Sequence, residues 1–493
     1  MRSLLAIVFI PIVSCSSMEA LAADSGAGLY QTHCASCHGA QLQGAQAPSL
    51  LLDRDSPAND EELAPVIRDG RPGKGMPAWN DTLSAFDIAS LVQFVQRRRE
   101  ENSAEHLRQA DMEFVRSLPR GLIRSEVQAF SVELVAEPDK PTGIAVLPDG
   151  RLLIAQERGG LRVVESSGLQ LGAIEGVPSC QPTDFFHRVL LGVALHPDYR
   201  QNGWVYLTCG NSETDRTGKV STEVMLIRGR LRAHMWVDSQ ILVRIPTNSS
   251  VGAPIAFDGR GHVFLTTASA AGLGTGPESK IPGNEPLPVA TLLATPPQDL
   301  TSPNGKVLRY NDDGSVPTDN PFIELPTSYG AIWSLGIRNA AGLAFDFERS
   351  QLWATDHGPR GGDKINRIFG GHNYGWPVIS YGTRYDGVAF TKETEREGMD
   401  QPFVTWTPDI GVSALAVYRG RAFPRWNGNL LVGSLVKQEL IRIAVADDRV
   451  VLQEVLIPHI GRIRALAIGP NGEIYVALEL AQQGVVVRLI PKS

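Results

Sequence analysis

A pattern of two short apolar segments separated by a polar turn recurs through most of the chain. In each copy the turn is rich in Asp, Asn and Gly, and the flanking segments read as short β-strands. The six copies span Pro141–Ala155, Leu191–Thr208, Ala253–Thr266, Ala341–Thr355, Ser413–Gly433 and Arg464–Ala477. One such hairpin cannot bury both of its faces alone. Repetition at this spacing therefore predicts an all-β six-bladed β-propeller, with a β-sandwich as the alternative.

A helical pattern precedes these copies. Ser84-Ala85-Phe86-Asp87 reads as a capping box that opens a helix, and the arginines at 97–99 favour its end. The apolar face of this helix is formed by Ile88, Leu91, Val92 and Val95. A second helical stretch from Glu105 to Leu118 carries no visible chemistry. We therefore expect a small all-α domain at residues 23–100, a linker at 101–127 and the propeller at 128–493.

The first 22 residues read as an export signal. Arg2 supplies the positive end, Leu4–Val13 is an apolar run too short to span a bilayer, and Ala20-Leu21-Ala22 fits a cleavage site. A rival phrase, Ile12-Val13-Ser14-Cys15, resembles a lipoprotein signal and would leave a lipid anchor at Cys15. Both readings predict a periplasmic protein without a transmembrane span.

Composition narrows the range of partners. The chain has 493 residues, a formal net charge of −7 and five cysteines. This net negative charge gives no indication of nucleic-acid binding, so small molecules and redox proteins are the expected partners. With Cys15 removed, Cys180 and Cys209 remain as a pair outside the stretch described next. In an oxidising compartment they form either a disulfide or two buried free thiols.

Cys34-Ala35-Ser36-Cys37-His38 carries the clearest chemistry in the chain. Two thiols at this spacing can each bond a vinyl group of haem, and the adjacent imidazole then ligates the iron. The alternatives are a zinc site, which would need a second ligand pair, and a redox Cys-x-x-Cys, which would need a preceding strand. The motif therefore predicts one covalent haem c, bound through Cys34 and Cys37 with His38 as an iron ligand.

Met76 is the candidate for the second axial ligand. It lies in a loop rich in glycine and proline, Gly70–Trp79, and the alternative is a methionine that fills a gap in the core. A His/Met pair leaves no open position on the iron, so this haem would carry electrons. With the helix that follows, residues 24–100 resemble a small class I cytochrome c.

Two phrases in the fourth repeat point to a known family. They are Asp356–Asn366 and Gly371–Pro377, which begin Asp-His-Gly-Pro-Arg-Gly-Gly-Asp and Gly-His-Asn-Tyr-Gly-Trp. Here residues 128–493 resemble the soluble PQQ-dependent sugar dehydrogenases, of the glucose/sorbosone or aldose sugar type. The resemblance implies a propeller that holds pyrroloquinoline quinone (PQQ), a tricarboxylate, near calcium.

Several positions match the family's site residues. The cofactor contacts implied by the resemblance are Arg338, Asn339, Arg462 and Arg464, with Trp406 lining the site. Arginines suit a polyanion, although surface charge or pairing with carboxylates is the alternative without the family. Gly358 and Pro359 match residues whose backbone carbonyls bind calcium, which prefers oxygen ligands.

The match fails at the family's catalytic base. The corresponding phrase is Asn248–Ile255, where Ser250 replaces the base histidine and Pro254 replaces an arginine. An unassisted serine is a poor base near neutral pH, and loss of a general base typically costs ~10²–10⁴ in rate. Another base, with His187 and His357 as candidates, would be needed for turnover.

Other departures lie nearby. His187 stands where the family has glutamine, and Ala268-Ser269 replaces a Gly-acidic pair. Val436 replaces a cofactor lysine, and Lys437 would point to the other face if this stretch were a strand.

The sequence as a whole predicts an exported quinohaemoprotein. It would oxidise an aldose sugar or related alcohol with PQQ and calcium, and pass the electrons to its own haem c. A downstream cytochrome or respiratory electron acceptor would then oxidise the haem. The alternative is a catalytically degenerate propeller that serves as a binding platform on a haem c electron-transfer protein.

Overall fold

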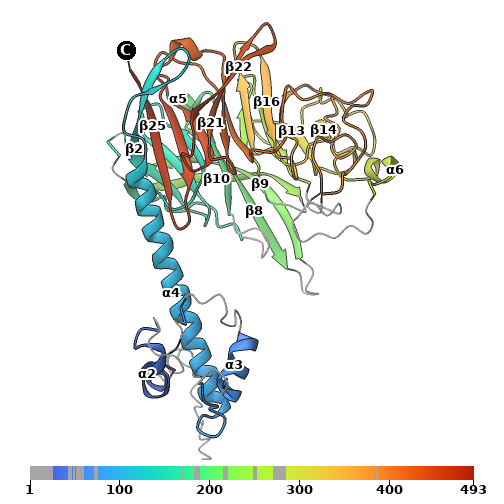
Figure 1. Cartoon of the computed structure of the whole chain (residues 1–493). Coiled ribbons are helices and arrows are strands. Elements are labelled where there is room, and N and C mark those ends of the chain that lie inside the picture. The colour runs from blue at the N-terminus through green and yellow to red at the C-terminus, as the bar shows by residue number, and fades with distance from the viewer. Residues whose placement is uncertain are drawn as a thin grey trace, which may run out of the picture. The chain divides into compact units, whose positions relative to one another are not determined.

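The computed structural model describes residues 26–42, 47, 50–51, 60–71, 76–165, 167–168, 170–181, 189–214, 220–247, 252–269, 285–384 and 387–492. The chain divides into two compact units, Met1–Met112 and Glu113–Ser493 (Figure 1). The predicted domain limits at residues 22, 100 and 127 stay predictions.

The first unit is helical. Residues 26–33 are helical, and they are followed by α2 (Ala35–His38), α3 (Asp60–Asp69) and α4 (Ala85–Ser117). The predicted capping box is confirmed: the Ser84 N–H donates to Asp87 Oδ2 at 2.9 Å, and the Asp87 N–H donates to Ser84 Oγ at 3.2 Å. The predicted apolar face of α4 is buried in the core of this unit, which contains Tyr30, Leu42, Leu63, Leu83, Ile88, Leu91, Val92 and Val95.

The expectation that α4 ends at Arg97–Arg99 is wrong. The helix continues as one element of 33 residues to Ser117. Residues 100–117 contain no glycine or proline that would break it, and Arg98 forms an ion pair with Glu101 at 2.8 Å on its exposed side. It ends two residues before Pro119, the first residue that cannot continue a helix.

The second unit is built from six antiparallel sheets. Five of the sheets have four strands each, which follow one another in the chain. The first contains β3 (Pro141–Val146), β4 (Leu152–Gln156), β5 (Leu161–Val164) and β6 (Gln170–Ala173), and the second contains β7 (Leu190–Leu195), β8 (Trp204–Thr214), β9 (Val220–Arg232) and β10 (Met235–Pro246). The third contains β11 (Ile255–Phe257), β12 (His262–Thr267), β13 (Lys306–Asn311) and β14 (Ile332–Leu335), the fourth contains β15 (Gly342–Asp346), β16 (Gln351–Asp356), β17 (Asp363–Ile368) and β18 (Val404–Trp406), and the fifth contains β19 (Val412–Val417), β20 (Leu430–Ser434), β21 (Leu440–Ala446) and β22 (Arg449–Ile457). Short helices α5 (Tyr199–Asn202), α6 (Val289–Leu293) and η2 (Pro424–Trp426) lie in connections.

The sixth sheet closes the ring. It joins β1 (Ile123–Arg124) and β2 (Ala129–Ala136) to β25 (Gly484–Lys492), β24 (Ile474–Glu479) and β23 (Arg462–Ile468). The first strands of successive blades, β3, β7, β11, β15, β19 and β23, are neighbours around the ring, and β23 contacts β3. The predicted six-bladed propeller is therefore confirmed.

Threonine hydroxyl groups fasten successive blades together. Thr208 Oγ1 donates to the carbonyl of Ala253 at 2.6 Å, and Thr355 Oγ1 donates to that of Ser413 at 2.6 Å. Thr266 Oγ1 donates in the same way to Ala340 at 2.9 Å. Each bond runs from the second strand of one blade to the start of the first strand of the next. We call this side of the ring, where the first strands begin, the entry end.

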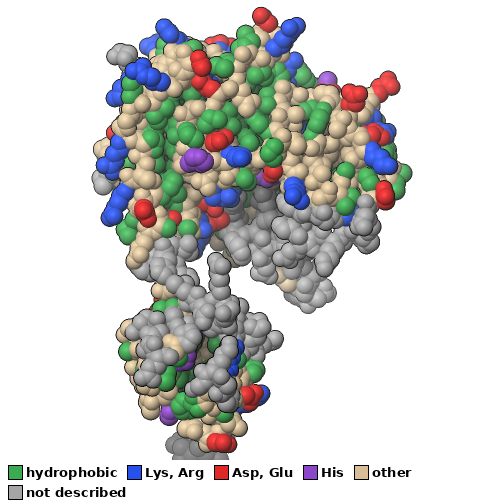
Figure 2. Space-filling view, in the orientation of Figure 1, with side chains coloured by type: hydrophobic (Ala, Val, Ile, Leu, Met, Phe, Trp, Pro, Cys, Tyr) green, Lys and Arg blue, Asp and Glu red, His purple; other side chains and the backbone are tan. Residues whose placement is uncertain are grey.

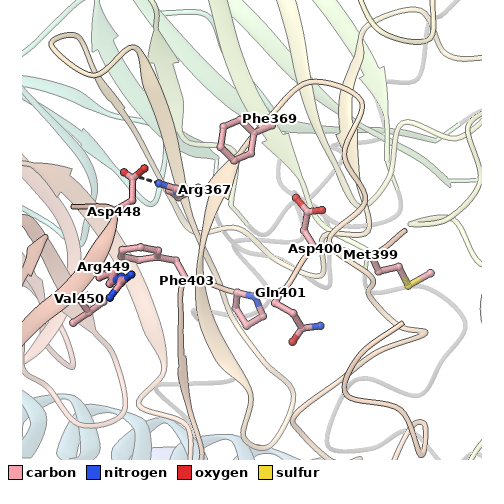
Figure 3. Close-up of a pocket in the computed structure, with 10 residues that line it drawn as sticks. Arg367, Phe369, Met399, Asp400, Gln401, Phe403, Asp448, Arg449 and Val450 are labelled. Carbon is pink, nitrogen blue, oxygen red and sulfur yellow. Dashed lines mark ion pairs between the residues drawn. The ribbon is translucent and has the colours of Figure 1, made fainter. Parts of the chain in front are cut away.

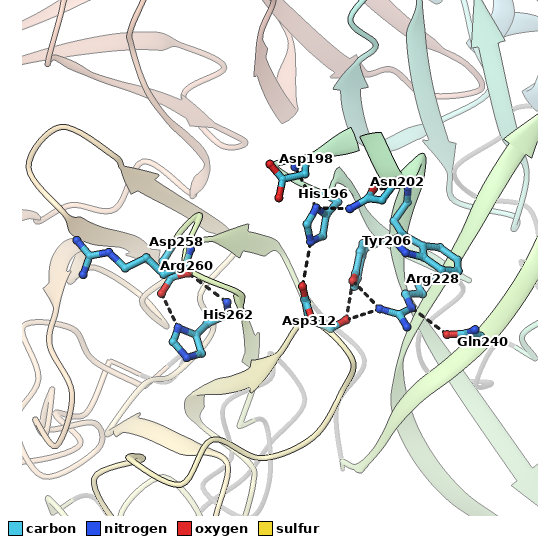
Figure 4. A network of polar contacts seen from close by, with 11 residues as sticks. His196, Asp198, Asn202, Tyr206, Arg228, Gln240, Asp258, Arg260, His262 and Asp312 are labelled. Carbon is cyan, nitrogen blue, oxygen red and sulfur yellow. Dashed lines mark hydrogen bonds and ion pairs between the residues drawn. The ribbon is translucent and has the colours of Figure 1, made fainter. Parts of the chain in front are cut away.

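Blades are numbered by their order in the chain, so that β3–β6 form blade 1 and β7–β10 form blade 2. A polar network holds blades 2 and 3 together at the opposite end of the ring, which we call the exit end (Figure 4). His196, after β7, lies 3.1 Å from Asp312 Oδ2, after β13. The Asp312 carbonyl accepts hydrogen bonds from the hydroxyl of Tyr206 at 2.6 Å and from Arg228 Nη1 at 2.9 Å. Every member has a partner inside the network, so its role is structural.

Cys180 and Cys209 form a disulfide, which decides between the two alternatives for this pair.

Residues Glu113–Val127, predicted to belong to a linker, are packed on the propeller. β1 pairs with β2, and Arg425 Nη1 donates to the carbonyl of Val127 at 3.0 Å. On the face in Figure 2, basic and acidic side chains are interspersed over the propeller. In the part of the chain that the structure describes, no helix has the length and apolar character needed to cross a bilayer.

Candidate functional site

The candidate haem-binding residues lie on one helical turn. Cys34 is the N-cap of α2, and His38 is its last residue. The N–H groups of Cys37 and His38 both donate to the Cys34 carbonyl, at 3.2 and 2.9 Å. Burial, with a smaller contribution from Cys37, raises the pKa of Cys34 to about 11, whereas Cys37 is exposed. One thiol is thus packed against the core of the unit and the other faces outward.

The backbone around Met76 is held close to the end of α3. Arg71 and Met76 exchange backbone hydrogen bonds at 2.9 and 3.2 Å, and the Trp79 N–H donates to the Arg68 carbonyl at 3.0 Å. Gly70 has a φ of +67°, and a Cβ there would lie 2.5 Å from the Pro77 carbonyl carbon. Only glycine fits this turn. Ligation of the iron by His38 and Met76 stays a prediction.

At the entry end of the propeller, Arg338 and Asn339 are held by Asp356. The buried Asp356 carboxylate accepts the Asn339 N–H at 2.7 Å and the Arg338 N–H at 3.2 Å. The His357 N–H donates to the Asn339 carbonyl at 3.0 Å. The backbone before β15 is therefore fixed against the end of β16.

The side chains in this region leave polar atoms for a ligand. Arg338 is buried, and its Nη1 donates to the carbonyls of His357 at 2.8 Å and Gly358 at 3.1 Å. Asn339 Oδ1 and Trp406 Nε1 are buried and have no hydrogen-bond partner among the described residues. Buried polar groups usually have a hydrogen-bond partner, so Asn339 Oδ1 can accept a hydrogen bond from a ligand and Trp406 Nε1 can donate one.

Arg462 and Arg464 share one carboxylate. Glu479, at the end of β24, accepts a hydrogen bond from Arg464 Nε and lies 3.8 Å from Arg462 Nε. Burial and the neighbouring Arg464 lower the pKa of Arg462. Two guanidinium groups with one carboxylate leave a net positive charge, which fits an anionic ligand.

Hydrogen bonds connect Arg338 with the pair Arg462 and Arg464 through the residues at the start of β19. His357, whose carbonyl binds Arg338, contacts the Val412 carbonyl through Nδ1 at 3.2 Å. Arg462 Nη1 donates to the Leu435 carbonyl at 3.4 Å, and the Leu435 N–H donates to the Gly411 carbonyl at 2.8 Å. All three predicted cofactor arginines thus lie at the entry end, and their convergence on one ligand stays a prediction.

The calcium expectation rests on backbone carbonyls. Gly358 and Pro359 are buried just after β16, and the Gly358 N–H donates to Asp363 Oδ1 at 2.7 Å. A Cβ on Gly358 would lie 2.3 Å from the Gly361 carbonyl oxygen, so a side chain is excluded. The described residues contain no cluster of three His, Cys, Asp or Glu side chains that could hold a metal. A cation here would share the Gly358 carbonyl with Arg338.

Of the two candidate bases, only His357 is described. His187 lies outside the described residues, and so do residues 248–251, which include Ser250. Because a carbonyl only accepts, the contact with Val412 assigns the proton of neutral His357 to Nδ1 and leaves a lone pair on Nε2. That lone pair could accept a proton.

Lys437 does not lie on a strand, so the expectation based on strand alternation is wrong. β20 ends at Ser434, so Val436 and Lys437 lie in a turn, where side chains do not alternate between faces. Both side chains are exposed, and both N–H groups donate to the Ile410 carbonyl.

Sequence reasoning did not assign the carboxylates that shape this end. Asp363 is fully buried, and its Oδ2 accepts the N–H groups of Ile410 at 2.9 Å and Val412 at 2.8 Å. Asp356 and Glu479 hold the arginines. The available signal was the acidic residue on each side of the glycine-rich turn Gly358–Gly362.

A cavity of about 680 Å³ lies elsewhere, on blades 4 and 5 (Figure 3). It lies at the exit end, beside the end of β17 and the β21–β22 turn, where Arg367 and Asp448 form an ion pair at 2.8 Å. Its lining includes Phe369, Asp400 and Phe403 and contains none of the predicted cofactor residues.

Comparison with known families agrees with this architecture. The glucose/sorbosone dehydrogenase family matches residues 138–488. The chain belongs to this family. A second match, to the cytochrome c oxidase cbb3-type subunit III family, covers residues 21–95. The chain therefore combines a cytochrome c domain with a sugar dehydrogenase propeller, and the predicted resemblances are confirmed.

Individual relatives cover the two parts separately. The aldose sugar dehydrogenase YliI of Escherichia coli is 32% identical over 365 residues, which cover 72% of this chain and 91% of the relative. The crystal structure of the soluble aldose sugar dehydrogenase from Escherichia coli, in the apo-form, superposes with a TM-score of 0.61 at 29% identity and covers 74% of this chain and all (100%) of that one. Cytochrome c55X of Stutzerimonas stutzeri is 39% identical over 59 residues, which cover 12% of this chain and 52% of the relative.

Proposed function

We propose that the chain is a PQQ-dependent sugar dehydrogenase that passes electrons to its own haem c. The excess of guanidinium groups at the start of β23, where Arg462 and Arg464 share Glu479, is the observation that best supports it. A tricarboxylate such as PQQ would neutralise this charge. The cytochrome c domain on the same chain supplies an electron acceptor without a diffusional encounter.

The residues of the entry end would divide the work. Arg462 and Arg464 bind carboxylates of the cofactor, Arg338 and Asn339 contact it from the start of β15, and Trp406 forms a wall. PQQ, when bound, supplies a two-electron acceptor. Gly358 and Pro359 are the candidates for calcium through their carbonyls. His357, through Nε2, or His187 takes the proton from the sugar hydroxyl.

The electron balance fixes the stoichiometry. Oxidation of an aldose to its lactone releases two electrons and two protons. Haem iron takes one electron at a time, so one sugar reduces two haem equivalents and the protons pass to solvent. A downstream cytochrome or respiratory acceptor then oxidises the haem.

Reconstitution tests this function. The purified chain is incubated with PQQ and calcium, desalted, and mixed with a panel of aldoses while haem absorbance is followed. Retained PQQ absorbance and sugar-dependent haem reduction are expected. Loss of PQQ on desalting, together with unreduced haem, would eliminate the proposal.

Ser250 in the position of the family base supports a second candidate, a binding platform without turnover. It predicts that PQQ is retained after desalting while neither haem nor an artificial dye is reduced by any sugar in the panel. His357→Ala and His187→Ala test the two bases in the first candidate. The variant that loses dye reduction but retains PQQ identifies the base.

We propose that the protein is located in the periplasm, which is supported by the haem chemistry and by the export signal predicted for residues 1–22. Mass spectrometry of the mature N-terminus distinguishes cleavage after Ala22 from a lipid anchor at Cys15.

A further inference from the structure

The cavity at the exit end is formed by three chain segments of blades 4 and 5 (Figure 3). Blade 4 contributes the end of β17 and residues 399–403, which lead into β18, and blade 5 contributes the turn between β21 and β22. Its volume of about 680 Å³ lies in the range of roughly 300–1,000 Å³ that is usual for small-molecule sites. All three segments belong to the propeller unit. The cavity is therefore a candidate binding site at the end of the ring opposite to the predicted cofactor residues.

Two phenylalanine rings line this cavity. The guanidinium carbon of Arg367 lies 5.7 Å from the ring centroid of Phe369 and 5.7 Å from that of Phe403. The Phe403 ring packs edge to face on the buried Trp353 at a centroid distance of 4.9 Å, which fixes its orientation. Phe369 is 39% exposed. Because the face of an aromatic ring is electron-rich, a partly exposed ring can cover the C–H groups of a ligand.

Ion pairs orient the polar groups of the lining. Arg367 Nη1 lies 2.8 Å from Asp448 Oδ1, and Asp400 Oδ2 lies 2.7 Å from His372 Nδ1. Asp448 follows Asp447 in a two-residue turn, and their φ values of +57° and +48° are typical of a tight hairpin turn, which Asp adopts readily. The other carboxylate oxygen of Asp400 and of Asp448 has no hydrogen-bond partner among the described residues. Each can accept a hydrogen bond from a ligand.

The lining carries no net formal charge. It contains two arginines, Arg367 and Arg449, and two aspartates, Asp400 and Asp448. The entry end differs, because two guanidinium groups share one carboxylate there. Charge complementarity at the exit end therefore favours a neutral ligand over an anion or a cation.

We propose that the exit-end cavity binds a neutral saccharide. Each hydroxyl group of a sugar donates and accepts hydrogen bonds, so adjacent hydroxyls match the donors of Arg367 and the acceptors of Asp400 and Asp448. The C–H face of the sugar ring lies on Phe369. Binding needs neither PQQ nor turnover, so this inference does not depend on the proposed function.

Calorimetric titration of the full-length protein, without PQQ or calcium, tests the site. Glucose, maltotriose and cellotriose are the neutral probes, and gluconate and glucosamine are charged analogues. At least one neutral saccharide should bind saturably, and both charged analogues should bind more weakly. Asp400→Ala should raise the dissociation constant about tenfold or more, since it removes a charged hydrogen-bond acceptor. Phe369→Ala should raise it roughly three- to tenfold.

Phe347→Ala is the matched control. Phe347 is an exposed phenylalanine just after β15, at the same end of the same blade, and it does not line the cavity. This variant should bind the saccharide with the affinity of wild type.

The methyl group of Met399 gives a second readout that needs no substitution of a proposed contact. Met399 lines the cavity, whereas Met235 is exposed at the start of β10 in blade 2. In protein labelled with methyl-¹³C methionine, added saccharide should shift the Met399 signal with the dissociation constant found by calorimetry. The Met235 signal should stay in place, and Met399→Leu assigns the signal.

Four outcomes would overturn the inference: no saturable binding of any neutral saccharide, tighter binding of a charged analogue, unchanged binding in Asp400→Ala and Phe369→Ala, or an equal loss in Phe347→Ala. A Met399 signal that does not move while calorimetry records binding would also overturn it, because the saccharide would then bind elsewhere. Failure of PQQ reconstitution would leave all of these results unaffected, so the two proposals fail separately.

Discussion

Arg464 Nε donates a hydrogen bond to Glu479 across the pair of strands β23 and β24, while Arg462 approaches the same carboxylate. The Glu479 carboxylate thus orients the guanidinium groups of two arginines at the entry end of the ring. Its effect is to hold the guanidinium groups in place without cancelling their charge.

Arg464→Ala should weaken PQQ binding. Hydrogen bonds to charged groups contribute about 1.5–3 kcal/mol each, so the dissociation constant should rise roughly ten- to a hundredfold. Titration calorimetry with PQQ measures it. Arg449→Ala removes the same charge from an exposed position on β22 and should leave the affinity unchanged. Equal losses in both variants would show that only net charge matters.

Asp363→Asn should destabilise the propeller. The carboxylate accepts N–H groups from Gly358, Ile410 and Val412, and an amide would present a donor to part of this set. We expect the free energy of unfolding to fall by at least about 3 kcal/mol. Asp447→Asn is the control, because this exposed turn residue has a φ of +48°, which Asn tolerates. Urea unfolding followed by circular dichroism compares the two.

Stability should fall in acid through Asp346. Burial opposes its ionisation, but hydrogen bonds and charge from Arg419 and Arg349 outweigh this and lower the pKa of the Asp346 carboxyl. A lowered folded-state pKa stabilises the fold fully above the ordinary Asp pKa of about 3.9, and this contribution is lost as the pH falls below it.

Asp346→Asn should remove that part of the pH dependence. At neutral pH it should cost about 3–5 kcal/mol, because two arginines lose a buried partner. Unfolding free energies measured between pH 2 and 7 check both statements. A wild-type slope that survives in the variant would assign the acid sensitivity to other carboxylates.

Met76→Ala should lower the reduction potential of the haem, since methionine ligation raises it. The vacated position should also bind added imidazole. Redox titration and absorbance spectra report the two effects, and Met112→Ala should show neither. A variant with an unchanged potential would exclude Met76 as a ligand.

Replacing Cys180 and Cys209 together by serine should reduce stability. The bond closes a loop with a sequence separation of 29, for which chain entropy predicts about 3–4 kcal/mol. Thermal unfolding of the oxidised wild type and the double variant gives the comparison. A reduced wild type that unfolds at the temperature of the oxidised form would show that the bond contributes nothing.

Local patterns carried most of the fold. The strand pair in Ala341–Thr355 can be predicted from its apolar segment, its Asp-containing turn and its second apolar segment. Ser84 with Asp87 likewise indicates the start of a helix. The end of α4 could not be read in this way, because Arg97–Arg99 favours a stop only weakly, whereas its continuation depends on residues 100–117 and on packing of Phe114 and Leu118 against the propeller.

The candidate site divides similarly. The arginines stand out because a polyanion needs them, but Asp356, Asp363 and Glu479 do their work through backbone and side-chain contacts between segments far apart in sequence. No spacing rule encodes such contacts. The turn at Val436 and Lys437 shows the same limit, since the end of β20 at Ser434 decides whether strand alternation applies.

The pairing of β2 with β25, from Ala129 with Lys492 to Ala136 with Val486, has a consequence for biogenesis. During synthesis, β2 has to wait for more than three hundred residues before its partner strand β25 emerges. Cys34 and Cys37, the predicted sites of haem attachment, emerge long before that moment. Under the proposed function, maturation should therefore proceed in a fixed order, with haem attached to the nascent polypeptide first and PQQ bound only once the ring has closed.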